Sequence, residues 1–249
     1  MTVRQEALLA SVAERYIASA EAVSSKFLEK RGFFGLKSAT IRSEMNELEA
    51  DGYLTHPYTS GGRIPTDKGY RYFVDNLISE KHKTKSEKGK KEIKNAIAAG
   101  GYDPHQINKN VAQTLSELSD NLVITNIMEE DDFCKVGLAG LFEMPDFREF
   151  DKMFRLTNFF DEFEGIFNQI IGRIFADVAD PSAELKIFIG RENPVKDIRD
   201  ETVMFTKYNL PRGCTGTLTL VGPTRMDYEK NIGLIRYTTQ ELNKLAQKT

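Results

Sequence analysis

Hydrophobic and polar positions between residues 37 and 75 follow a pattern that predicts a helix, a hairpin and a second helix. The first helix should begin at Ser38, whose hydroxyl can accept a hydrogen bond from an amide of the first turn, and end at Asp51-Gly52. Its apolar positions recur at helical spacing and form one face: Ile41, Met45 and Leu48.

The opposite face of this helix carries short residues and a single long cation: Ala39, Thr40, Arg42, Ser43 and Asn46. Such a face can approach the edge of a base pair closely, because no bulky side chain holds it off. The hairpin strands are expected at 53–56 and 62–64, with a Gly-rich tip between them. This pattern favours a recognition helix followed by a wing, although an ordinary helix–hairpin unit of a globular domain would look the same.

Two further helices are predicted before this stretch, over 3–17 and 24–30, and one after it, over 66–80, which Thr66 is expected to cap. Together with the hairpin they make a winged helix-turn-helix domain of residues 1–80. Phe33 and Phe34, in the connection before the recognition helix, are interpreted as core residues rather than as DNA contacts.

The segment 81–102 is rich in lysine and ends in two glycines, which predicts a basic linker. A second domain, 103–249, should begin where Asp103 caps a helix with Pro104 at its first position. A helix over 147–178 carries phenylalanines on more than one face. This is typical of a helix buried on two sides or of one that also forms an oligomer interface.

The last third of the chain alternates turns and strands, so the whole chain is expected to be an α+β protein. Strands are predicted at 185–189, 202–208 and 214–221, with the last two joined as a hairpin. A final helix is predicted at 225–247.

Composition supports a globular protein, because 40% of the 249 residues are hydrophobic and 29% are charged. The net charge of −3 does not by itself suggest a nucleic-acid binder, but the charge is unevenly distributed. Residues 1–94 carry 17 Lys and Arg against 13 Asp and Glu, whereas the remainder carries 17 against 24. Seven lysines between positions 81 and 94 form either a solvated linker or a segment that contacts phosphate.

The sequence has no Gly-x-Gly-x-x-Gly, P-loop or Gly-x-Ser-x-Gly motif, and no His/Cys spacing that suits zinc. We therefore expect no catalytic residue, no cofactor and no metal, and an enzyme is the least favoured class. No long apolar run and no signal-peptide pattern are present, and Cys134 and Cys214 lack paired spacing. These features predict a cytoplasmic protein without disulfides.

Several short segments carry a family resemblance: SATIR at 38–42, EM at 44–45, LE at 48–49, GYL at 52–54, TS at 59–60, GRIPT at 62–66, GYRY at 69–72, GLAGLFEMPDF at 137–147, IGREN at 189–193 and VGPTRMDY at 221–228. In these segments the chain closely resembles the heat-inducible transcription repressor family, HrcA. Ser43, Tyr58 and Gly61 depart from the family pattern on the presumed DNA side, which could alter operator affinity or preference.

The resemblance implies a winged helix-turn-helix followed by a GAF-like α/β domain. It also implies a repressor of heat-shock chaperone genes that binds double-stranded DNA at an inverted-repeat operator and is released on heat stress. Such a protein acts as a homodimer, at least on DNA, and has the chaperonin as a partner. The DNA-contacting residues would be Ser38, Thr40, Arg42, Ser43 and Asn46 in the major groove, and Tyr58, Thr59, Ser60 and Arg63 in the wing. Arg42 is the best single candidate for a bidentate contact with guanine or a contact with phosphate.

One departure from the family is large. Members of the family are usually longer by roughly a hundred residues. The additional residues form a segment that holds part of the GAF-like sheet and an inserted dimerising domain. In this chain only Val123–Val136 stands in place of that segment. We therefore expect the GAF-like domain to be truncated and the usual dimer interface to be absent or replaced, for example by the Phe-rich helix. Two alternatives remain: a regulator that senses a small molecule through the GAF-like domain, and a protein-interaction module that binds no DNA.

Overall fold

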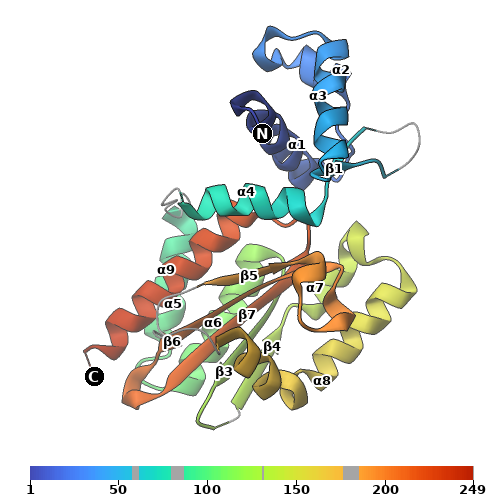
Figure 1. Ribbon diagram of the computed structural model, residues 1–249. Helices are drawn as coiled ribbons and strands as arrows, with labels where there is room; N and C mark the ends of the chain where they lie inside the picture. The colour runs from blue at the N-terminus through green and yellow to red at the C-terminus, as the bar shows by residue number, and fades with distance from the viewer. Residues whose placement is uncertain (58–61, 80–86, 131, 176–184, 249) are drawn as a thin grey trace. The chain divides into compact units, whose positions relative to one another are not determined.

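The computed structural model describes residues 1–57, 62–79, 87–130, 132–175 and 185–248, without the side chains of 78–79 and 168–175. The chain forms two compact units, which are drawn in Figure 1. Unit 1 consists of Met1–His82 and Thr224–Asp227, and unit 2 consists of Lys83–Pro223 and Tyr228–Thr249.

Unit 1 is a winged helix-turn-helix, as predicted. Its elements are α1 (Val3–Ser19), α2 (Ser25–Lys30), the 3-10 turn η1 (Phe33–Gly35), α3 (Ser38–Ala50), β1 (Leu54–Thr55), β2 (Ile64–Pro65) and α4 (Asp67–Ser79). The two short strands pair antiparallel, with Thr55 opposite Ile64. This order of helices and hairpin is the winged form of the helix-turn-helix motif.

Side-chain caps explain where two of these helices begin. The hydroxyl of Ser24 accepts a hydrogen bond from the amide of Phe27 at the start of α2, over 3.2 Å. The hydroxyl of Thr66 accepts one from the amide of Gly69 at the start of α4, over 3.1 Å, which confirms the predicted cap. Each hydroxyl satisfies an amide that has no partner inside its own helix.

Unit 2 contains five helices, five strands and four short turns in its described part. The helices are α5 (Glu87–Ala99), α6 (Pro104–Ser119), α7 (Leu138–Glu143), α8 (Phe150–Phe175) and α9 (Tyr228–Ala246). The strands are β3 (Leu122–Ile127), β4 (Asp132–Val136), β5 (Lys186–Ile189), β6 (Glu201–Asn209) and β7 (Thr215–Pro223). The turns are η2 (Pro145–Phe147), η3 (Gly190–Glu192), η4 (Lys196–Ile198) and η5 (Pro211–Gly213).

The strands form one antiparallel sheet in the order β4-β3-β7-β6-β5. β6 and β7 form the predicted hairpin, paired from Glu201 with Pro223 to Asn209 with Thr215. β3 and β4 form a second hairpin, in which Val123 lies opposite Val136. The residues that bridge the expected deletion therefore extend the sheet to its β4 edge, and the mixed fold of helices on a sheet confirms the predicted fold class.

Both faces of this sheet are covered, because successive side chains of a strand point to opposite sides. One face packs under α8: Leu122, Ile124, Val203, Phe205 and Val221 form a buried cluster with Phe159, Phe163 and Phe167. The other face is buried under α6 and α9, with Val123, Met204 and Leu220 inside. Because both faces are covered, β6 and β7 are buried at nearly every position, including their threonines Thr202, Thr206, Thr217 and Thr219.

The segment assigned to a basic linker is partly helical, which corrects the expectation from its lysine content. Residues 87–99 form α5, in which Ile93 and Ile97 are buried. These two residues lie four apart, so they share one helical face, and α5 packs with that face against α6 and α9. The lysines of α5 occupy its remaining surface, which is why their number obscured the helix.

The final helix begins later than predicted, at Tyr228 rather than at Arg225. The reason is that Thr224–Asp227 belong to unit 1, where Arg225 Nη1 donates to the carbonyl oxygen of Ile17 over 3.4 Å. The start predicted for the Phe-rich helix also moves, because Phe147 lies in η2 and α8 begins at Phe150. Residues 176–178, which the prediction included, lie outside the described residues.

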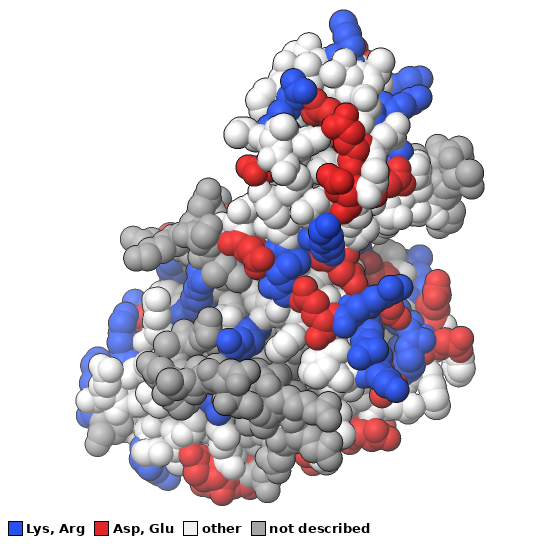
Figure 2. Space-filling model, in the orientation of Figure 1, with Lys and Arg blue, Asp and Glu red and all other residues white. Residues whose placement is uncertain are grey.

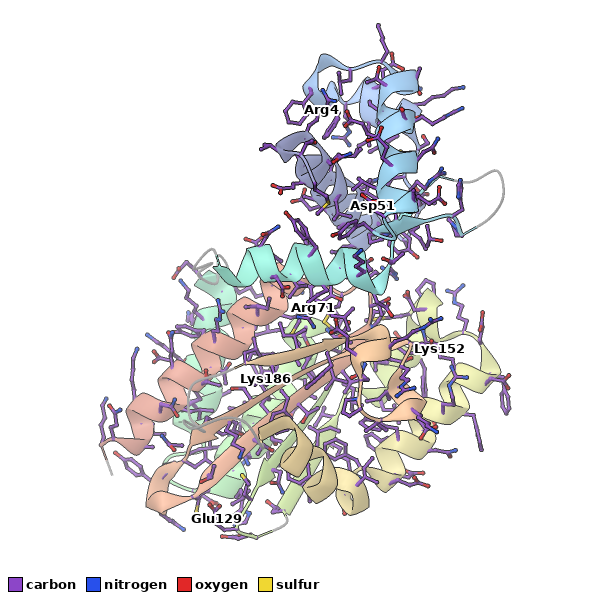
Figure 3. All side chains as sticks on the ribbon, viewed as in Figure 1. Arg4, Asp51, Arg71, Glu129, Lys152 and Lys186 are labelled. Atoms are coloured by element: carbon purple, nitrogen blue, oxygen red, sulfur yellow. The ribbon has the colours of Figure 1, made fainter. Side chains whose placement is uncertain are left out.

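A buried carboxyl group stands at the start of β6. Glu201 is only 1% exposed, and Oε1 lies 3.6 Å from Nζ of Lys152 on α8, which Figure 3 labels. Burial raises the pKa of the Glu201 carboxyl to about 7, and Lys152 offsets only part of this effect. Ionisation of the Glu201 carboxyl therefore costs more free energy in the folded state than in the unfolded chain.

We expect Glu201→Gln to stabilise unit 2 at pH 8 and to leave its stability nearly unchanged at pH 4.5. Because the folded-state pKa lies above its ordinary value, the penalty for ionisation is absent at acid pH, grows between about pH 4.5 and 7, and is constant above. The gain at pH 8 should be about 2–3 kcal/mol. Urea denaturation measures it, with exposed Glu162→Gln as the control. A gain that does not vary with pH would contradict the raised pKa.

Candidate nucleic-acid interface

The orientation of α3 is set by its buried face. Ile41, Met45 and Leu48 lie in one cluster with apolar residues of α1 and α2. The helix begins at Ser38 as predicted, but the preceding residue, Lys37, is its cap and provides no side-chain hydrogen bond. The Ser38 hydroxyl instead pairs with the hydroxyl of Ser25 over 2.8 Å, so it joins α3 to α2. The predicted cap by Ser38 is therefore wrong, because the half-buried side chain has a partner on the neighbouring helix.

The opposite face of α3 is open to solvent. Thr40, Arg42, Ser43 and Asn46 are all exposed, as the helical spacing predicted. Arg42 makes no hydrogen bond or ion pair with any residue in the described part of the chain, so its guanidinium is available to an external partner. Ser38 lies at the edge of this face, where it is half-buried.

The carboxylates of α3 are tied to neighbouring side chains. Glu44 is buried and forms an ion pair with Arg4, which Figure 3 labels, and Glu47 accepts a hydrogen bond from Gln5 Nε2 over 2.8 Å. Glu49 pairs with Arg63 over 2.8 Å. Each acidic group therefore has a cationic or donor partner, which lowers the local cost of bringing a phosphate backbone near this helix.

The wing is anchored to the connection between α1 and α2. Val23 and Arg63 exchange two backbone hydrogen bonds, of 2.9 and 2.8 Å, which extends the small sheet beyond β2. Gly62 approaches this connection so closely that a Cβ on it would lie 2.5 Å from the carbonyl carbon of Val23. Tyr58, Thr59 and Ser60, the predicted wing contacts, lie outside the described residues.

Arg63, the remaining predicted wing contact, is turned toward α3. Its side chain is 12% exposed and forms the ion pair with Glu49. Nη2 also donates to Oδ1 of Asn46 over 2.7 Å, and Nη1 donates to Nε2 of His56. Because arginine can only donate, His56 accepts at Nε2 and donates from Nδ1 to Glu49. Two predicted DNA-contacting residues, Arg63 and Asn46, are thus in direct contact.

Sequence reasoning missed one exposed aromatic residue at this surface. Phe33 packs against the core of unit 1 as predicted, but Phe34 is 61% exposed, which corrects its assignment to the core. Its backbone is left-handed, at φ 47° and ψ 21°, and Gly32 and Gly35 on either side also have positive φ. The two glycines were the available signal, since they mark a turn that directs one of the two aromatic rings outward.

Figure 2 shows Lys and Arg mixed with Asp and Glu on the drawn face of both units, rather than gathered in one basic patch.

Among the described residues, no group of His, Cys, Asp and Glu is arranged to hold a metal ion. None of the helices in the described ranges is long and apolar enough to cross a membrane.

Unit 2 contains a small apolar cavity between α8, η4 and β6. Phe159, Phe163 and Phe205 line it, together with Asn193 and Thr219. Its volume of about 20 Å³ is enough for one water molecule. The cavity therefore does not support the small-molecule sensor, which stays a prediction.

A family model described as "HrcA protein C terminal domain" matches residues 71–232, more than half of the chain. Proteins named heat-inducible transcription repressor HrcA are similar over nearly their whole length. That of Acetivibrio thermocellus is 26% identical over 339 positions, covering 98% of this chain and 96% of the relative. That of Desulfitobacterium hafniense is 27% identical over 345 positions, covering 98% and 97%. These names describe repressors and not enzymes.

Both alignments are longer than the 249-residue chain. At least 90 positions of each alignment are therefore gaps in this chain. This agrees with the shortened form expected from the sequence. A crystal structure described as that of a hypothetical protein superposes with a TM-score of 0.80 over 100% of both chains, at 18% identity, which supports the fold alone.

The winged-helix fold and these relatives define the class of this protein as a transcriptional repressor. The chain belongs to the HrcA family.

We expect Gly62→Ala to disrupt the packing of the wing against the connection between α1 and α2. The new methyl group would collide with backbone atoms of Ala22 and Val23, which cannot move aside like a flexible side chain. The expected loss of stability is about 1–3 kcal/mol, measured by thermal unfolding. Gly140→Ala in α7 is the matched control, because a methyl group there meets no atom within 4 Å. Equal melting temperatures for both variants would contradict this role of Gly62.

Proposed function

We propose that this protein represses transcription in the cytoplasm by binding double-stranded DNA with α3 in the major groove. The observation that carries the proposal is the exposed face of Thr40, Arg42, Ser43 and Asn46. Each carboxylate of the same helix is paired with a side chain from α1 or the wing. Arg42 is the group best suited to a bidentate guanine contact, since it is exposed and has no partner among the described residues. Ser38 contributes at the edge of this face.

The wing is proposed to contact phosphate or the minor groove through Tyr58, Thr59 and Ser60, at the tip between β1 and β2. Two observations support this proposal. The wing lies next to α3, and the backbone bridge between Val23 and Arg63 anchors the wing. A phosphate contact by Arg63 itself would require its guanidinium to leave Glu49.

The proposed targets are chaperone genes that carry an inverted-repeat operator, with release on heat stress. Family membership and the name shared by the relatives, heat-inducible transcription repressor, support this assignment. By the same resemblance, the chaperonin is proposed as a partner that favours the binding-competent state.

An inverted repeat requires two copies of the chain, related by two-fold symmetry. We propose a homodimer on DNA, although this chain is shorter than its relatives. Phe150 and Phe154 of α8 are 78% and 56% exposed, and their rings stack with centroids 6.3 Å apart. This exposed pair is the part of the Phe-rich helix that could contact a second copy.

Replacing Arg42 with alanine should weaken binding to the operator by about 1–3 kcal/mol, because it removes a base or phosphate contact from the centre of the exposed face. Binding is measured by titration of a fluorescent operator duplex at fixed salt. Lys248→Ala is the control, since it removes one positive charge from the exposed C-terminal end of unit 2. Unchanged binding by Arg42→Ala would remove this residue from the interface.

The stoichiometry on DNA tests the symmetric arrangement. Sedimentation of the full chain with an inverted-repeat duplex should give two chains per duplex, and a duplex with a single half-site should bind at least tenfold more weakly. A complex that stays at one chain per inverted repeat would contradict the homodimer.

A further inference from the structure

The contact between Arg63 and Asn46 determines how the recognition helix presents its amide. A guanidinium carries only donors, so the atom of Asn46 that faces Arg63 Nη2 at 2.7 Å must be the carbonyl oxygen Oδ1. The amide nitrogen Nδ2 is then directed away from Arg63. Asn46 is exposed, and no residue in the described ranges accepts a hydrogen bond from Nδ2.

Arg63 is held firmly enough to impose this orientation. Its backbone is fixed by two hydrogen bonds to Val23, and its side chain is fixed by Glu49 and His56. Glu49 lies on α3 three residues after Asn46, so both groups that hold the guanidinium at Nη2 come from the same helix. The side chain of Arg42, by contrast, is exposed and has no partner within the described residues.

The fixed amide has a consequence for base recognition. An asparagine that reads adenine in the usual bidentate way uses Oδ1 to accept from N6 and Nδ2 to donate to N7. Here Oδ1 faces Arg63, so the group that Asn46 directs outward is the donor Nδ2. In the major groove guanine, adenine and thymine each present an acceptor, whereas cytosine presents the N4 amino donor.

We propose that Arg63 is a positioning residue that sets base specificity through Asn46. By holding Oδ1, it makes the recognition helix present Nδ2 outward, so the base at that operator position must offer an acceptor and cytosine is rejected. This inference rests on the proposed function, since it requires α3 to lie in the major groove. It assigns Arg63 a role different from the phosphate contact expected from the sequence.

The test is selection from a duplex library with randomised inverted repeats, using the full-length chain. Wild-type protein should exclude cytosine at one position of each half-site by about tenfold or more. Arg63→Ala should accept all four bases at that position, with an unchanged profile elsewhere. Asn46→Asp presents an acceptor beside the same guanidinium, and should change the preference at that position toward cytosine. Arg42→Ala is the matched control, because it should alter a different position.

The outcomes distinguish the positioning role of Arg63 from the proposed function. If Arg63→Ala weakens binding to all sequences alike and reduces the salt dependence, with the cytosine exclusion intact, Arg63 contacts phosphate and the inference is overturned. If wild-type protein enriches no sequence, the proposed function fails and the inference fails with it. Should Arg63→Ala not fold, Asn46→Asp decides, since an unchanged preference in that variant also overturns the inference.

Discussion

Burial of the apolar stripe on α3 is the constraint on which the rest of unit 1 depends. Ile41, Met45 and Leu48 pack into one cluster with α1 and α2, which fixes the rotation of the helix about its axis. A turn of one residue would rotate the helix by about 100° and bring polar groups into the cluster without partners. The stripe therefore decides that Arg42, Ser43 and Asn46 face outward.

The charges of α3 are arranged around that face. The helix carries three glutamates and one arginine, which by composition alone argues against approach to a polyanion. Each glutamate has a partner on another element: Arg4 and Gln5 from α1, and Arg63 from the wing. Arg42, the one cation of α3, has no such partner within the described residues. Local pairing thus matters more for this surface than the net charge of the chain.

Unit 2 shows how a shortened chain keeps a complete core. The β3–β4 hairpin forms the β4 edge of the sheet, from the residues where the sequence places the expected deletion. Phe159, Phe163 and Phe167 cover the face below α8, while Phe150 and Phe154 near its start remain exposed. The helical spacing predicted a wide apolar arc, but could not say which phenylalanines would face the sheet, because that depends on where α8 crosses it.

The sequence by itself determined the features that depend on nearby residues. The bounds of α3, the wing hairpin, the Thr66 cap and the β6–β7 hairpin follow from spacing, short polar caps and turn residues. Only the tertiary structure decided the partners of Ser38 and Arg63, the direction of Phe34 and the helical state of residues 87–99. The physical reason is that these features depend on side chains or faces from separate elements, and packing of the apolar cores determines which of them meet.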